Sequence, residues 1–201
     1  MRALLGTILL LCTWSSAVLA AERFASPTGT GTACSDAAPC SVETLLGQLV
    51  AGDTGWLKDG VYQGAAYMLN LASFAANKSG TSGAPITVRA VNDGGARIDG
   101  QGVRGPLVVG TSPGTNNWWV FQGFDVHDSN AANFVVWAYG QNLVFRRICA
   151  WNAGGATDAA ANNQVWGVVP AANILFEDVC WLGTGRNIFI EGSNPEQGLA
   201  G

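Results

Sequence analysis

The sequence predicts an all-β fold of the solenoid type, because one ten-residue pattern occurs three times without a gap. The three copies are Trp118–His127, Asn142–Trp151 and Asn173–Leu182. Phenylalanine stands at the same position of every copy, and apolar residues alternate around it as in a strand with one buried face. The copies keep their register while the segments between them differ in length, which is typical of stacked rungs joined by loops.

The first 20 residues have the pattern of a secretory signal peptide. Arg2 precedes an apolar run over residues 3–12, and the segment 18–20 resembles a small-residue cleavage site. The apolar run is too short to span a membrane. We therefore expect residues 1–20 to be removed, which leaves a secreted, periplasmic or cell-surface protein without a membrane insertion.

The charge balance excludes one class of partner. The chain has 10 Lys and Arg against 14 Asp and Glu, a formal net charge of −4. Loss of Arg2 with the signal peptide makes the remainder more acidic. Such a chain has no basic surface for nucleic acid, and its low charged content of 12% is usual for an extracellular β-rich protein.

Four cysteines remain after that cleavage, and an even number in an exported chain favours disulfides. Cys34 and Cys40 would close a short loop. Cys149 and Cys180 occupy the same position of two copies, so they would lie on neighbouring rungs about 4.8 Å apart, within the reach of a disulfide. A zinc site is the weaker interpretation, because no Cys-x-x-Cys occurs and His127 is the single histidine.

Residues 21–55 are expected to form an N-terminal strand, the Cys34–Cys40 loop and a capping helix. Ser41 can cap a helix whose apolar residues follow helical spacing, namely Val42, Leu45, Leu46, Leu49 and Val50. A single apolar face suggests a lid over one end of the core. The rungs are expected over 56–201, with early strands at Trp56–Lys58, Ile86–Ala90, Arg97–Asp99 and Leu107–Val109.

A second set of strands accompanies the copies. Counting from the copies aligns Asn133–Trp137 with Gln164–Val168, and Asn187–Glu191 fits the same template. Alternation along this alignment turns Phe134, Val165 and Ile188 toward the core.

The same alternation places an aromatic group on the outer face: Trp166 and Phe189, with Trp137 beside them. The loop before Trp166 expands to residues 152–163, and insertions in solenoids tend to cluster on the binding face. Exposed rings stack on the C–H faces of sugars, so these three residues are candidates for substrate binding. The alternative is that the rings lie under loops as a satellite core.

Two segments carry a family resemblance: residues 24–64 (FASPTGTGTACSDAAPCSVETLLGQLVAGDTGWLKDGVYQG) and residues 86–100 (ITVRAVNDGGARIDG). They resemble the opening and early rungs of the secreted right-handed parallel β-helix proteins, the pectate-lyase-like superfamily. The resemblance implies that fold and a carbohydrate-binding protein, with polysaccharide lyase or glycoside hydrolase as the activity. Fold does not determine function, and a non-catalytic cell-surface, adhesion or structural module is the alternative.

Proteins of this type generally have more rungs. This chain ends soon after Glu191, so its last rung has only one predicted strand and no predicted terminal cap. Solenoids normally cover their ends. We therefore expect the sequence to be the N-terminal part of a longer protein.

A lyase needs a base and a positive charge or metal to stabilise the anion. The resemblance implies a lysine or arginine base, and Arg186 is the basic residue in a short loop facing the groove. A hydrolase needs two carboxylates across the groove, for which Asp158 and Glu191 are the candidates. The expected partner is a polysaccharide, and calcium is a candidate cofactor.

Two further polar groups have a functional and a structural interpretation. His127, with Asp125 and Asp128 nearby, could act as an acid or base or help to bind calcium, or could be a polar turn. Arg146 over Glu177 and Arg147 over Asp178 first resemble a catalytic cluster. We interpret both as cross-rung ion pairs.

Overall fold

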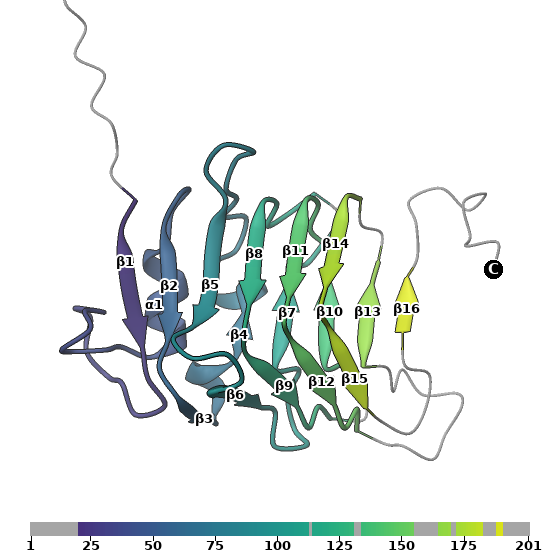
Figure 1. Cartoon of the computed structure of the whole chain (residues 1–201), viewed down its shortest axis with the longest axis horizontal. Helices are drawn as coiled ribbons and strands as arrows, with labels where there is room; N and C mark the ends of the chain where they lie inside the picture. The colour runs from purple at the N-terminus through teal and green to yellow at the C-terminus, as the bar shows by residue number, and fades with distance from the viewer. Residues whose placement is uncertain are drawn as a thin grey trace, which may run out of the picture.

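The chain winds into a solenoid whose successive rungs stack, so that their strands form three parallel sheets (Figure 1). The structure is a computed structural model that describes residues 20–112, 114–130, 134–154, 165–169, 172–182 and, for the backbone, 188–190. Each named strand pairs in parallel with the strand one rung earlier or later. The predicted parallel β-helix is therefore confirmed.

In the described part of the chain, the elements fall into three sheets and three short helices. Sheet 1 contains β1 (Glu22–Ala25), β2 (Thr54–Leu57), β5 (Ile86–Ala90), β8 (Trp119–Gln122), β11 (Leu143–Arg146) and β14 (Ile174–Glu177). Sheet 2 contains β3 (Gly60–Tyr62), β6 (Ala96–Asp99), β9 (Asp125–His127), β12 (Cys149–Trp151) and β15 (Cys180–Leu182). Sheet 3 contains β4 (Leu69–Asn70), β7 (Leu107–Val109), β10 (Val136–Ala138), β13 (Trp166–Val168) and β16 (Ile188–Ile190). The helices are α1 (Val42–Gln48), η1 (Ala65–Tyr67) and α2 (Leu71–Phe74).

The three sequence copies stack residue for residue, as predicted. Phe145 pairs with Phe121 on one side and with Phe176 on the other. The bend between sheets 1 and 2 also repeats, because Gly123, Arg147 and Asp178 all take a positive φ there. A left-handed residue turns the chain within one position, so each copy makes the same sharp corner.

Aromatic rings fill the centre of the solenoid. Phe121, Phe145 and Phe176 form a stack with centroid distances of 5.3 and 5.5 Å. Trp166 of β13 meets this stack edge-on, 5.3 Å from the Phe145 ring. Face and edge contacts of this kind add to the gain from burying the rings.

The capping helix is confirmed, with one difference at its end. The Ser41 side chain accepts a hydrogen bond from the Thr44 amide, which is the expected N-cap. The buried residues of the predicted apolar face are Val42, Leu45, Leu46 and Leu49, whereas Val50 lies beyond the helix and is exposed. Gly55 of β2 leaves room for this face, because a Cβ there would approach the Leu49 side chain to 3.0 Å.

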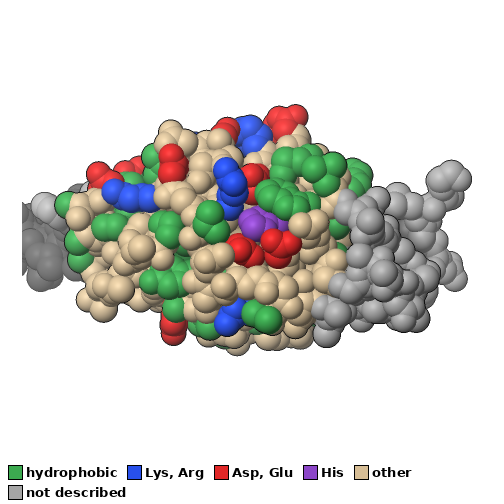
Figure 2. Space-filling view, turned by 90° about the horizontal axis from the view of Figure 1, so that it is seen from below, with side chains coloured by type: hydrophobic (Ala, Val, Ile, Leu, Met, Phe, Trp, Pro, Cys, Tyr) green, Lys and Arg blue, Asp and Glu red, His purple; other side chains and the backbone are tan. Residues whose placement is uncertain are grey.

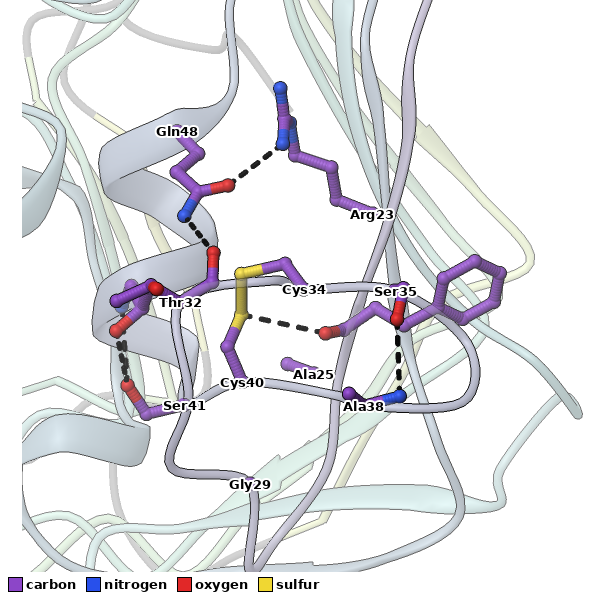
Figure 3. The surroundings of a disulfide bond; sticks show 12 residues. Arg23, Ala25, Gly29, Thr32, Cys34, Ser35, Ala38, Cys40, Ser41 and Gln48 are labelled. Atoms are coloured by element: carbon purple, nitrogen blue, oxygen red, sulfur yellow. Dashed lines mark hydrogen bonds between the residues drawn. A yellow bond between two sulfur atoms is a disulfide. The ribbon is translucent and has the colours of Figure 1, made fainter.

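The Cys34–Cys40 loop covers the free edge of β1 (Figure 3). The Phe24 amide donates to the Cys34 carbonyl at 2.7 Å, and the Cys40 amide donates to the Phe24 carbonyl at 3.0 Å. An uncovered edge strand would offer these groups to another chain. The predicted disulfide is present, and it closes the loop that provides this cover.

The predicted register of sheet 3 is wrong by one residue. The alignment paired Val135 with Trp166 and Trp137 with Val168, but the strands pair Val136 with Trp166 and Trp137 with Gly167. Side chains alternate between the faces of a strand, so a slip of one residue exchanges the faces. Trp166 is therefore only 1% exposed, and the prediction that it lies on the outer face is wrong.

One of the two predicted ion pairs is present. The Arg146 Nε donates to a Glu177 carboxylate oxygen at 2.6 Å. Arg147 pairs instead with Asp93, also at 2.6 Å, and not with Asp178. Asp93 lies in the turn between β5 and β6, two rungs before Arg147. The pair passes the intervening corner at Gly123, where a Cβ would collide with Asp93.

Within the described ranges, no helix is both long enough and apolar enough to cross a bilayer. The predicted signal peptide falls on residues of which only Ala20 is described. The Cys149–Cys180 disulfide is also present. Two disulfides are consistent with an extracellular protein.

Candidate functional site

The outer face of sheet 2 brings together polar residues from three rungs. Residues in register on parallel strands share a face, and here Asp99 of β6 pairs with His127 of β9, which pairs with Trp151 of β12. Inward residues of the same strands, such as Val126 and Ala150, are fully buried. The three outward side chains therefore form a column across neighbouring rungs.

Asp99, His127 and Asp128 form what we call the carboxylate–histidine cluster. The His127 Nδ1 lies 2.7 Å from an Asp128 carboxylate oxygen and 3.9 Å from one of Asp99. The histidine side chain is only 12% exposed. Figure 2 shows acidic side chains beside the single histidine on this face of the molecule.

Local structure holds each carboxylate in place. Asp99 accepts hydrogen bonds from the Gln63 side chain and from the Gln101 amide, both at 2.7 Å. Asp128 has a left-handed backbone, with φ at 57°, and its amide donates to the Trp151 carbonyl. With this backbone conformation, the Asp128 carboxylate lies against the ring of the preceding residue, His127.

The His127 ring is fixed on its other side by stacking. It lies almost flat on the Trp151 ring, with centroids 4.7 Å apart and an angle of 7° between the planes. When Nδ1–H donates to the Asp128 carboxylate, the lone pair of the neutral ring lies on Nε2. An imidazole oriented in this way can take up a proton at a defined atom.

A pocket of about 390 Å³ opens beside the cluster. Asp99, Gln101 and Asp128 form one part of its wall, and Asn152, Ala153 and Gly154 form another. These last residues begin the 152–163 insertion that the sequence marked as a binding feature. The pocket thus combines carboxylates, amides and small residues, and it lies beside the column of Asp99, His127 and Trp151.

The cluster does not fit calcium, the ion that the aspartates near His127 suggested as a candidate. Its ligand atoms lie within 4.8 Å of one another, but only two of its three residues offer oxygen. Calcium takes six to eight oxygen ligands, whereas an imidazole with carboxylates suits zinc or a related ion. We assign no chemical step to a metal.

Asp125 lies two residues before His127 on the same outward face. Burial raises the pKa of its carboxyl group, and a backbone hydrogen bond from Cys149 and the charges of Arg97 and His127 act in the opposite direction. Arg97 is the residue in register with Asp125 on β6. The cationic side chain of Arg97 therefore stands on the same face as the cluster.

The raised pKa of Asp125 predicts a pH-dependent stability. The folded chain binds this proton more tightly than the unfolded chain, so stability falls as pH rises through the folded pKa. Asp125→Asn should remove that pH-dependent loss of stability. The asparagine side chain keeps an oxygen that can accept the hydrogen bond from the Cys149 backbone. We expect the variant to be more stable than the wild type at pH 7 and equal to it at low pH.

Urea denaturation at several pH values measures this difference. Asp36→Asn is the control, because Asp36 is largely exposed. A gain for Asp125→Asn that is independent of pH would contradict the electrostatic explanation.

The structure does not describe most of the predicted site residues. Arg186, Asp158 and Glu191 lie outside the described residues, as does the side chain of Phe189. Their roles stay predictions.

Trp137 and Trp166 can be compared with the structure. Trp137 faces outward and is half-buried, 4.1 Å from the Phe134 ring and 5.4 Å from the Tyr139 ring. Trp166 belongs to the core and cannot serve as an exposed sugar platform.

Asp99 is the residue that the sequence analysis missed. The segment Arg97–Asp99 has the same polar, apolar, polar pattern as Asp125–His127. Aligning the two would have placed Asp99 over His127. A match of three residues is a weak signal, and Arg97–Asp99 lies outside the ten-residue copies.

The described residues define the chain as a parallel β-helix with an outward polar pocket. None of the protein-family models and none of the curated proteins compared with the sequence matches it. Among solved structures, the chain is similar to one described as the crystal structure of pectate lyase Pel9A, with a TM-score of 0.55 and 18% identity. The match covers 92% of this chain and 57% of that one. At this identity the likeness concerns the fold alone, and the chain spans little more than half the length of that structure.

Proposed function

We propose that this chain is a secreted carbohydrate-binding β-helix protein that binds a polysaccharide in the pocket beside His127. The observation that carries the proposal is the carboxylate–histidine cluster next to Trp151. Sugar sites combine an apolar plane with a few directed polar groups. Asp99 and Asp128 line the pocket and would accept hydrogen bonds from hydroxyl groups. Trp151 precedes the lining residue Asn152 and would offer an apolar surface at the margin of the pocket. The likeness to a pectate lyase fold agrees with this class of ligand.

The cluster also supports a catalytic role of the lyase type. A lyase removes the proton α to a uronate carboxylate and must stabilise the anion that forms. The C–O bond at the β carbon then breaks as the C=C bond forms, and the leaving oxygen takes up a proton from water. His127 could accept the proton at Nε2 while Asp128 balances the charge of the imidazolium. Arg97, on the same face, could pair with the uronate carboxylate.

The decisive experiment measures binding and turnover separately. Purified protein is titrated with polygalacturonate, alginate, xylan and mannan, and each mixture is assayed for new reducing ends and for the ultraviolet absorbance of a new C=C bond. We expect saccharide binding, and for a uronate polymer the unsaturated product of a lyase. Reducing ends without the double bond would indicate a hydrolase.

His127→Asn is expected to reduce turnover by roughly 10²–10⁴-fold, the usual contribution of a general base, while binding changes little. Trp151→Ala should weaken binding itself. Val50→Thr is the control, because Val50 is exposed and lies just after α1, away from the cluster.

Two results would redirect the proposal. Binding without any product would assign the alternative, a non-catalytic surface or adhesion module that uses the same pocket. Saccharide binding that Trp151→Ala leaves unchanged would exclude the pocket as the saccharide site.

A further inference from the structure

A second pocket lies on a different sheet, at the N-terminal end of the solenoid. It has a volume of about 500 Å³, within the range of about 300–1,000 Å³ typical of small-molecule sites. Its residues come from β1, β2, the Cys34–Cys40 loop and the segments that follow β2 and β5. Strands β1, β2 and β5 lie side by side in Figure 1. We call it the N-terminal pocket.

Two aromatic rings form its apolar wall. Phe24 of β1 and Trp56 of β2 are in register on the outer face of sheet 1, and their rings are nearly parallel, 11° apart, with centroids at 6.3 Å. Val91 adds an aliphatic surface. The centroid distance exceeds the strand spacing of about 4.8 Å, so the rings are displaced sideways and each leaves part of its surface uncovered by the other.

Neighbouring cations hold this wall in place. The Arg89 guanidinium lies 4.5 Å from the centre of the Trp56 ring, and the Lys58 ammonium lies 5.9 Å from the centre of the Phe24 ring. Arg89 follows Trp56 in the same outward column. Cation–π contacts of this kind fix aromatic side chains, so the wall is ordered before a ligand arrives.

The polar rim is acidic. Glu22, Asp36 and Asp59 contribute three carboxylates, against the ammonium of Lys58 and the guanidinium of Arg89 on the Trp56 ring. That ammonium is already engaged, 2.8 Å from an Asp36 carboxylate oxygen. An anionic sugar would meet net repulsion here, which separates this pocket from a uronate site.

The rim is also rich in groups that suit hydroxyls. Asn92 donates its side-chain amide to Asp59 at 2.8 Å, which orients both groups. Asp36 is carried by the disulfide-closed Cys34–Cys40 loop and pairs with Lys58. Oriented carboxylates and amides beside an apolar wall favour a ligand with many hydroxyl groups and C–H faces.

We propose that the N-terminal pocket is a separate binding site for a neutral saccharide chain. It does not depend on the pocket beside His127, because the two lie on different sheets and share no residue. The aromatic wall packs against the sugar rings, and the acidic rim accepts hydrogen bonds from hydroxyl groups and disfavours uronates.

Calorimetric titration with cellohexaose, mannohexaose and xylohexaose, and with hexagalacturonate as the anionic comparison, tests this site. We expect at least one neutral hexaose to bind with a dissociation constant of about 1 mM or tighter. Trp56→Ala should weaken that binding by roughly tenfold, the effect of losing one aromatic contact. Trp151→Ala and Asp128→Asn, in the other pocket, should leave it unchanged.

A second variant keeps the proposal testable if Trp56→Ala does not fold. Glu22→Lys changes only the charge of the rim, and it should weaken the neutral hexaose while improving hexagalacturonate. Circular dichroism and thermal unfolding confirm that each variant is folded. No binding of any neutral hexaose at millimolar concentration, or binding that Trp56→Ala and Glu22→Lys leave unchanged, would overturn the proposal.

Discussion

Replacing Phe145 by alanine is expected to lower the free energy of unfolding by about 3–5 kcal/mol, the usual cost of removing a buried aromatic side chain. Phe145 is fully buried and is the middle ring of the stack with Phe121 and Phe176. It also meets the edge of Trp166. Its removal leaves a cavity that touches three rungs and two sheets.

Equilibrium urea denaturation of the oxidised protein measures this effect. Val144→Ala is the matched control, because Val144 precedes Phe145 on β11 and faces outward. We expect a change of about 1 kcal/mol or less for that variant. Similar losses for the two variants would show that the stack is not the centre of stability.

Removing the Cys149–Cys180 disulfide by a double replacement with serine should lower the free energy of unfolding by about 3–4 kcal/mol. The bridge joins residues 31 positions apart, on paired strands of neighbouring rungs. A cross-link that closes a longer loop restricts the unfolded chain more.

The Cys34–Cys40 pair provides an internal comparison, because its sequence separation is only 6. The corresponding double replacement should lower the free energy of unfolding by about 2 kcal/mol. Unfolding both variants in urea under the same conditions gives the difference. A larger loss for Cys34–Cys40 would indicate that covering the β1 edge matters more than loop closure.

The sequence predicted sheets 1 and 2 well because their copies carry markers. The phenylalanine recurs in all three copies and the cysteine in two of them, and no residue is inserted between these positions in any copy. Register was therefore determined by several side chains at once. The cross-rung disulfide and the Arg146–Glu177 pair followed from that register.

Sheet 3 lacks such markers. Its strands β10 and β13 are three residues long, and segments of different length connect them to the copies. Nothing in Val136–Ala138 or Trp166–Val168 distinguishes one register from the next, because apolar residues occupy almost every position. The tryptophan at 166 was therefore assigned to the wrong face.

The carboxylate–histidine cluster could be predicted only in part. His127 and Asp128 are adjacent in sequence, but Asp99 joins them through pairing between rungs. The Arg147–Asp93 pair likewise joins a corner to a turn of another rung. Contacts of this kind depend on where loops place side chains, and the repeat alone does not contain that information.

The parallel pairing of rungs also sets how the chain can fold. Thr54 pairs with Thr87, and Thr87 pairs with Val120, so each new contact of sheet 1 closes a loop of roughly 30 residues. The entropy of loop closure depends on that length, and it does not grow as further rungs are added. Topology of this kind has no short-range strand pairing to start from, but once one pair of rungs has formed, every later rung joins an existing template.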